Sequence, residues 1–236
     1  MLSPCDRITF LLTNAAETAI IFLRRTRPDR GDSRKEMNME KSRISTRTLT
    51  GLALFTALVV VLQFMGQFIR FGPFSISLTL IPIVVGAALY GAGAGAWLGF
   101  VFSVIVLFTD TAAFMPISPL GTILTVLVKG TAAGFLAGVV YRAVAKKNEW
   151  LGAILAAIVC PVVNTGLFLL GCVLFFLPTI TEWGKAAGFE NVGTYMVTGF
   201  VGLNFLAELA INIVLSPVIV RLVKLGRASA DHRDNR

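Results

Sequence analysis

The feature that most constrains this chain is a series of long apolar runs without charge. Residues 48–69 hold no charged side chain, and neither do residues 79–108. A helix needs roughly 20 consecutive apolar residues to cross the hydrocarbon core of a bilayer. The 236-residue chain is also 56% hydrophobic and 14% charged, whereas soluble domains are about 45–50% apolar. We therefore predict an integral membrane protein rather than a water-soluble fold.

Six helical spans account for these runs and give an all-α, multi-pass membrane protein. As one helix, the 79–108 run would extend about 45 Å and overshoot the bilayer. We predict a break near the glycines at 91–95, after a short second span that contains Pro82. Pro116 and Pro119 indicate a loop after the third span. The predicted spans are residues 48–69, 79–90, 91–108, 120–141, 151–177 and 195–220.

The distribution of basic residues predicts the orientation of these spans. Of 21 Lys and Arg residues, 18 lie before residue 48, between 142 and 149, or after 220. The loops on the opposite side hold only Arg70 and Lys185, and Lys129 lies within a span. Since Lys and Arg are enriched in cytoplasmic loops, both termini are predicted to be cytoplasmic. The net charge of +8 is thereby explained without nucleic-acid binding.

Outside the spans we expect polar tails. Residues 1–43 form a predicted N-terminal tail, 44–225 the membrane domain and 226–236 a cytoplasmic tail. Met37 and Met39 stand just before the first span, so we expect residues 1–36 to lie upstream of the true start. The tail is then either disordered or partly untranslated, and a surface-lying amphipathic helix is the alternative.

Small residues recur at helical spacing in two spans. In lipid, such stripes allow two helix backbones to approach closely, and we interpret these as sites of packing within the molecule. The stripes are Gly91, Gly95 and Gly99 in one span and Gly130, Gly134 and Gly138 in another.

Polar side chains inside spans are costly and mark a cavity or an interhelical pair. Asn204, Glu208 and Asn212 follow one another at four-residue steps and share a helix face. At 1.5 Å per residue, Lys129 and Asn204 lie about 14 Å below the outer surface, and Glu208 about 20 Å. We predict a pocket that opens outward, and a buried ion pair between Lys129 and Glu208 is the structural alternative. Further candidate ligands in the outer half are Gln63, Gln67 and Arg70 on the first span and Asn164 on the fifth.

Several kinds of chemistry have no support in the sequence. The only histidine is His232, in the C-terminal tail. The sequence therefore excludes a membrane-embedded Ser-His protease and a His-based metal site. No G-x-x-x-x-G-K-[ST] phosphate loop is present. Cys160 and Cys172 are about 18 Å apart on one predicted helix and cannot pair. We therefore expect neither an enzyme nor a cofactor or metal site.

One local run resembles a known family. The segment FGPFSISLTLIPIVVGAALYGAGAGA, residues 71–96, leads from a loop through a Pro-containing second helix into a Gly/Ala-rich third helix. It resembles the substrate-binding (S) components of energy-coupling-factor (ECF) vitamin transporters over about residues 44–225. The resemblance implies a cell-membrane protein that binds a vitamin in an outward-facing pocket. It also implies partners, namely a transmembrane coupling protein and two ATPase subunits, and a docking motif on the first helix that matches Ala53 and Ala57.

The resemblance does not identify the vitamin. Residues 203–210 are similar in position to an asparagine-containing segment of riboflavin-binding members, but the lysine expected after that asparagine is absent. Lys129 would neutralise a carboxylate, and the amide side chains would bond hydroxyl or amide groups, a pattern compatible with pantothenate. Riboflavin, folate, a pyridoxine-type vitamin and a pyrimidine precursor stay open. The alternatives to an S component are a stand-alone proton-coupled transporter that uses Glu208, and a membrane scaffold.

Overall fold

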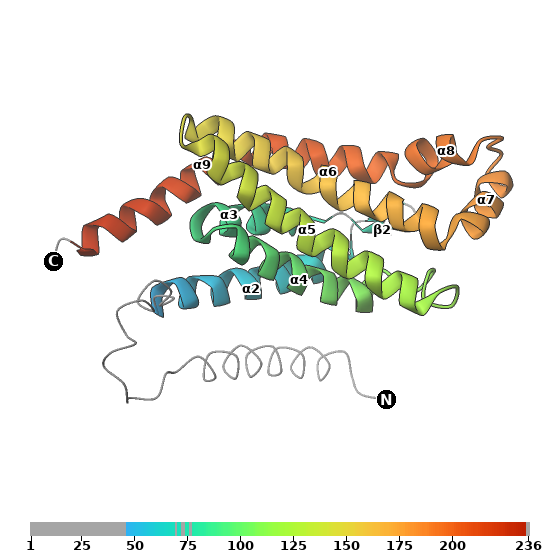
Figure 1. The fold of residues 1–236 in the computed structure, drawn as a ribbon, viewed down its shortest axis with the longest axis horizontal. Coiled ribbons are helices and arrows are strands. Elements are labelled where there is room, and N and C mark those ends of the chain that lie inside the picture. The colour runs from blue at the N-terminus through green and yellow to red at the C-terminus, as the bar shows by residue number, and fades with distance from the viewer. Residues whose placement is uncertain (1–45, 69, 72–73, 76, 235–236) are drawn as a thin grey trace, which may run out of the picture. The chain divides into compact units, whose positions relative to one another are not determined.

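The computed structural model describes residues 46–68, 70–71, 74–75 and 77–234. The expected start at Met37 or Met39 and the tail at residues 1–43 lie outside the described residues. The described chain is helical apart from one antiparallel pair of two-residue strands. Its elements are α2 (Thr46–Gly66), β1 (Arg70–Phe71), β2 (Phe74–Ser75), α3 (Leu80–Tyr90), α4 (Ala92–Thr109), α5 (Pro119–Ala145), α6 (Glu149–Phe175), α7 (Leu177–Ala186), α8 (Val192–Thr194), the π-helix η2 (Tyr195–Phe200) and α9 (Gly202–Asp234) (Figure 1).

Among the described residues, five helices are long and apolar enough to cross a membrane. These are α2, α4, α5, α6 and α9. The predicted second span is the 11-residue helix α3, which is too short to be counted with them. The predicted break near residue 91 is confirmed: Gly91 has φ of 96° between α3 and α4. Glycine adopts such a φ without the penalty that a Cβ imposes.

Two boundaries differ from those predicted. The loop predicted at residues 178–192 contains the helix α7, in which Ile180 and Gly184 are buried. Pro178 lies in the first turn of α7, where its missing N–H is tolerated. The predicted sixth span starts at Tyr195 as a π-helix, and α9 itself begins at Gly202 and continues to Asp234, beyond the predicted end at Val220.

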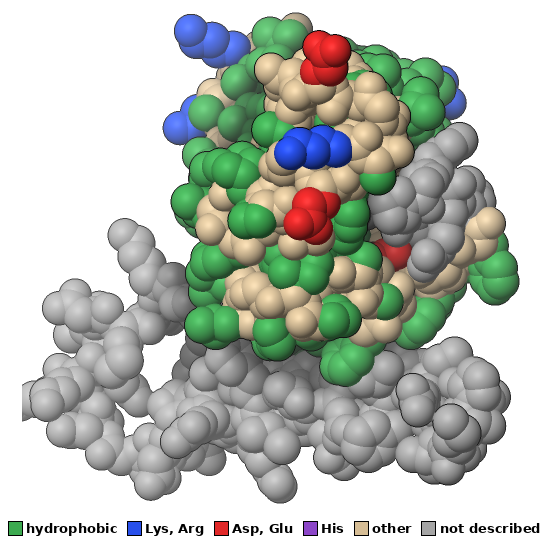
Figure 2. Space-filling view, turned by 90° about the vertical axis from the view of Figure 1, so that its right-hand side faces the viewer, with side chains coloured by type: hydrophobic (Ala, Val, Ile, Leu, Met, Phe, Trp, Pro, Cys, Tyr) green, Lys and Arg blue, Asp and Glu red, His purple; other side chains and the backbone are tan. Residues whose placement is uncertain are grey.

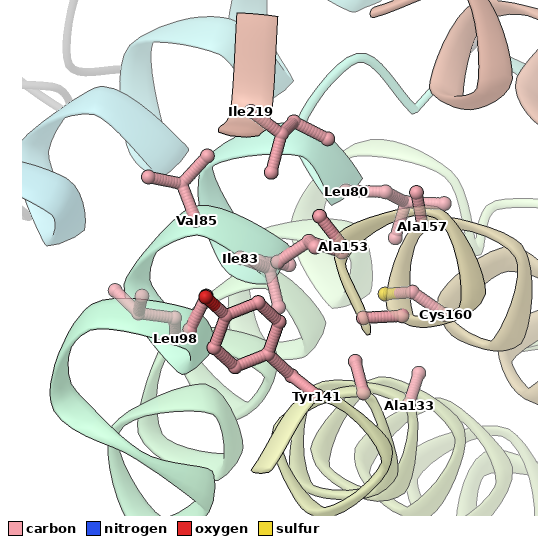
Figure 3. Close-up of a cluster of buried hydrophobic side chains, with 14 of the residues drawn as sticks. Leu80, Ile83, Val85, Leu98, Ala133, Tyr141, Ala153, Ala157, Cys160 and Ile219 are labelled. Carbon is pink, nitrogen blue, oxygen red and sulfur yellow. The ribbon is translucent and has the colours of Figure 1, made fainter. Parts of the chain in front are cut away.

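Helix α3 lies at the centre of the larger hydrophobic core. Eight of its 11 residues are buried, as expected of a helix that is apolar on every face. Figure 3 shows its side chains between those of α5, α6 and α9, with Tyr141, Ala157 and Ile219 directed toward them. The burial of this short helix explains why the part of the apolar run that it occupies, residues 80–90, holds no charged side chain.

The glycine stripes form one tight crossing between α4 and α5, so the predicted packing within the molecule is confirmed. A Cβ added to Gly99 would meet the carbonyl oxygen of Gly130, and one added to Gly95 would meet that of Gly134. The backbones of the two helices are therefore in contact, which is the packing that small residues permit in lipid.

The ends of the helices gather at two faces of the bundle. The first turn of α2, the junction of α3 and α4, and the turn between α5 and α6 lie together at the left of Figure 1. The loop 110–118, α7 and α8 lie at the opposite end. Exposed Arg142, Lys146 and Lys147 belong to the first group, and exposed Lys185 belongs to the second.

Candidate binding site

A cavity of about 50 Å³ lies where α4, α5, α6 and α9 meet the segment before α3. Its lining is unusually polar for the interior of a helical bundle in lipid. Four residues predicted from the sequence line it, namely Lys129, Asn164, Asn204 and Glu208. Ser77, Phe102, Val106, Asp110, Thr165, Phe168, Val201 and Phe205 complete the lining.

Glu208 is the most deeply buried charged residue of this cavity, with 2% of its surface exposed. Its Oε1 accepts hydrogen bonds from the backbone N–H of Ser77, at 3.0 Å, and from Nδ2 of Asn204, at 3.1 Å. Its Oε2 has no hydrogen-bond partner among the described residues. One carboxylate oxygen thus holds the segment before α3 against α9, and the other stays available to a donor.

Lys129 reaches the same cavity from α5. Its Nζ lies 4.8 Å from the centroid of the Phe168 ring, a cation–π contact. Within the described part of the chain, neither oxygen of Glu208 forms an ion pair with this ammonium group. The structure therefore does not form the buried Lys129–Glu208 pair that was the structural alternative.

Two asparagines add unpaired acceptors. Asn164 Oδ1 and Asn204 Oδ1 are both buried without a hydrogen-bond partner in the described part of the chain. Buried polar atoms are nearly always paired, because an unpaired one costs roughly 1–3 kcal/mol. Together with Glu208 Oε2, these atoms give the cavity three acceptors near one ammonium group, an arrangement suited to a molecule with donors and a negative charge.

The glutamines on α2 do not line the cavity, although they were predicted to bind the ligand. Gln63 and Gln67 donate to Oδ2 of Asp110, at 3.1 Å and 2.8 Å. Gln63 Oε1 also accepts from the hydroxyl of Thr79 at 2.8 Å. The two glutamines therefore act on the cavity through Asp110, which lines it. The side chain of Arg70 lies outside the described residues.

Sequence reasoning missed Asp110 and Phe168. Asp110 stands at the start of the loop predicted after the third span, and a carboxylate at the end of a span is a signal for a polar contact. Phe168 carries no such signal, since an aromatic residue in a span is ordinary. Only its position over Lys129 marks it.

An aromatic cluster lies between the cavity and the end of the molecule that carries α7. Phe114 is at its centre, 5.0 Å from Phe176, 5.9 Å from Trp183 and 6.2 Å from Phe200, measured between ring centroids. Phe168, at 5.8 Å from Phe114, belongs both to this cluster and to the cavity wall. Figure 2 looks onto this end, where charged side chains are sparse among apolar and polar ones.

On the far side of α2 from Gln63, small and apolar side chains are exposed. Ala53 and Ala57 are exposed one turn apart, and Leu54 beside them is 70% exposed. The face is continued by exposed Leu58, Val61 and Met65. Such a face contacts either lipid or another helix.

No metal site is formed in the part of the chain that the structure describes, where no three His, Cys, Asp or Glu side chains gather. Cys160 and Cys172 are both free and buried, as the spacing predicted. The polar groups that line the cavity offer hydrogen bonds and charge.

Comparison with known proteins finds similar sequences and a similar fold. The family model of the ECF transporter substrate-specific component matches residues 47–220. The pantothenic acid transporter PanT of Lactococcus lactis subsp. cremoris (strain MG1363) is 32% identical over 207 residues, covering 80% of this chain and 98% of the relative. A solved structure of ThiT from Listeria monocytogenes has a TM-score of 0.53 and 22% identity, covering 75% of this chain and 97% of that chain. At that identity, the likeness to ThiT concerns the fold alone.

Proposed function

This chain belongs to the family of ECF transporter substrate-specific components, and we propose that the vitamin it captures is pantothenate. The family consists of membrane-integral transporter components rather than enzymes. The observation that carries the proposal is the cavity, in which one ammonium group lies near three unpaired acceptors. Pantothenate has the matching groups, namely a carboxylate, an amide and two hydroxyls. The similarity of this chain to the pantothenic acid transporter PanT supports the same substrate.

Within this proposal, Lys129 binds the carboxylate, and Asn164, Asn204 and Glu208 accept hydrogen bonds from the hydroxyl and amide groups. A buried acceptor that is left unpaired rejects analogues lacking the donor, so such a site is selective. Gln63 and Gln67 position Asp110 in the wall. Enclosed ligand pockets are about 300 Å³ or larger, so the cavity of about 50 Å³ must enlarge by movement of side chains such as Phe168 and Phe205.

We further propose that the membrane domain crosses the bilayer six times, with both termini cytoplasmic. The short helix α3 is the second of these spans and adds to the five longer helices. The exposed basic residues support this orientation. Arg142, Lys146 and Lys147 lie at the turn between α5 and α6, and Arg221 and Lys224 lie in the later part of α9. In this orientation the cavity lies in the outer half of the membrane.

We also propose that transport depends on separate subunits, a transmembrane coupling protein and two ATPases. The exposed stripe of Ala53 and Ala57 on α2 is the docking surface in this scheme, because small side chains let a partner helix approach closely. A stand-alone proton-coupled transporter would need no such partner. Uptake driven by a pH gradient in vesicles that contain only this chain would contradict the scheme.

Mass spectrometry of the purified protein tests the substrate. The chain is expressed in cells supplied with pantothenate, purified in detergent and denatured, and the released small molecules are identified. We expect pantothenate in near-stoichiometric amount, because a closed polar cavity releases its ligand slowly. Recovery of a different vitamin would contradict the proposal.

A further inference from the structure

A second cavity of about 30 Å³ lies beside the first, beneath the loop 110–118. Four residues line both cavities, namely Val106, Asp110, Lys129 and Phe168. These side chains are thus the wall between the two spaces. Lys129 is the basic residue of that wall, and its ammonium group can be approached from either side. The second cavity is otherwise lined mainly by apolar groups, including Phe114, Val126 and Phe176.

Thr125 is the exception in this second cavity. The hydroxyls of Thr111 and Thr122 donate to backbone carbonyls, those of Leu107 at 2.7 Å and Ser118 at 2.8 Å. Thr125 is 7% exposed, and its hydroxyl has no hydrogen-bond partner among the described residues. Thr125 precedes Lys129 by four residues, so the two side chains lie on one face of α5.

The two cavities differ in the kind of polar group that they offer. The unpaired atoms of the first are the acceptors Asn164 Oδ1, Asn204 Oδ1 and Glu208 Oε2. A carboxylate has no proton to give them and would be repelled by Glu208. The second cavity offers the hydroxyl of Thr125, which lies one helical turn before Lys129, and Lys129 lines the same cavity. Asp110 lines both cavities, so its charge acts on either space and does not distinguish them. Its Oδ2 accepts from Gln63, Gln67 and Thr109.

We propose that the cavity at Thr125 is the subsite for the ligand's carboxylate, with the Thr125 hydroxyl and the Lys129 ammonium as its donors. This inference rests on the proposed function and fixes how the vitamin is oriented, with its hydroxyl groups toward Asn204 and Glu208. The Phe168 ring, which now lies over the ammonium group, moves aside to join the two spaces. The exchange replaces a cation–π contact by two charge-assisted hydrogen bonds to a carboxylate, which also neutralise the buried ammonium group.

The test compares Thr125→Val, which keeps the shape and removes the hydroxyl, with Thr125→Ser, which keeps the hydroxyl. Binding to the purified full chain is titrated with pantothenate and with pantothenol, an alcohol that lacks the carboxylate. We expect Thr125→Val to weaken pantothenate binding about tenfold or more, as for a lost hydrogen bond to a charged group. Thr125→Ser should stay within about threefold of wild type. Pantothenol should bind wild type and Thr125→Val equally.

Two results overturn the subsite alone. The first is that wild type binds pantothenate tightly and Thr125→Val binds it with the same affinity. The second is that Thr125→Val loses affinity for pantothenate and pantothenol equally, which means that the hydroxyl stabilises the fold and does not bind the carboxylate. Thermal unfolding of each variant identifies one that no longer folds. If Thr125→Val does not fold, Lys129→Met carries the test and is expected to remove the preference for pantothenate over pantothenol; an undiminished preference overturns the subsite. A wild-type chain that binds no pantothenate overturns the proposed function, and the subsite with it.

Discussion

Glu208 combines a structural contact and the proposed binding role within one carboxylate. Its Oε1 is occupied by the N–H of Ser77 and by Asn204, while its Oε2 faces the cavity without a partner in the described chain. Asn212, one turn further along α9, donates to the backbone carbonyl of Glu208 at 2.8 Å. The N-terminal part of α9 is therefore held in place by the same residues that give the cavity its acceptors.

At the residue scale, we predict that Glu208→Ala destabilises the protein more than Glu208→Gln. Alanine leaves the buried Ser77 N–H without an acceptor, which costs about 1–3 kcal/mol of unfolding free energy. Glutamine keeps an oxygen in that place, so its loss should be smaller. Thermal unfolding in detergent measures both variants. Equal midpoints for the two variants would mean that the bond to Ser77 does not hold this segment.

Helix periodicity made part of the site predictable at this scale. Asn204 and Glu208 were placed on one face by their four-residue spacing, and a charged or amide side chain in a span signals a cavity. For Gln63 and Gln67 the same rule identified polar side chains within a span but not their hydrogen-bond partner in the structure. Both glutamines donate hydrogen bonds to Asp110. The position of Asp110 in the cavity wall depends on how α2 packs beside the end of α4, which the sequence does not show.

At the element scale, the crossing of α4 and α5 has no room for a side chain. We predict that Gly99→Ala lowers stability by about 1–3 kcal/mol, because its Cβ would meet the Gly130 carbonyl and the two backbones would have to separate. Gly93→Ala on the same helix is the matched control, since a Cβ there has nothing within 4 Å. Chemical or thermal unfolding in detergent compares the two, and an equal effect would show that the crossing tolerates separation.

Element boundaries were predictable where a residue forces them. Gly91 ends α3 because its φ of 96° suits glycine, and the α6 N-terminus follows Asn148, whose side chain accepts from the N–H groups of Trp150 and Leu151. Helix α7 was missed, since its apolar face is short and its charged residues resemble a loop. That helix is stabilised by packing of Ile180 in the aromatic cluster, which local composition does not reveal.

At the scale of the whole molecule, the proposed docking surface on α2 is separate from the cavity, which is lined by no residue of that helix. We predict that Ala53→Leu with Ala57→Leu leaves pantothenate affinity within about twofold of wild type, since neither residue lines the cavity. Uptake by the complete transporter should fall at least tenfold, because two bulky side chains prevent close helix contact. Ala210→Leu, at an exposed position on α9, is the control for added bulk in lipid. Full uptake by the double variant would refute the docking surface.

The central claim is that a cavity with one ammonium group and several unpaired acceptors selects pantothenate. Isothermal titration of the purified wild-type chain with pantothenate, riboflavin, folate and pyridoxine in turn tests it most directly. The account predicts saturable binding of one pantothenate per chain, at least a hundredfold tighter than that of any of the other three vitamins. Tighter binding of one of those three, or no saturable binding of pantothenate, would contradict it.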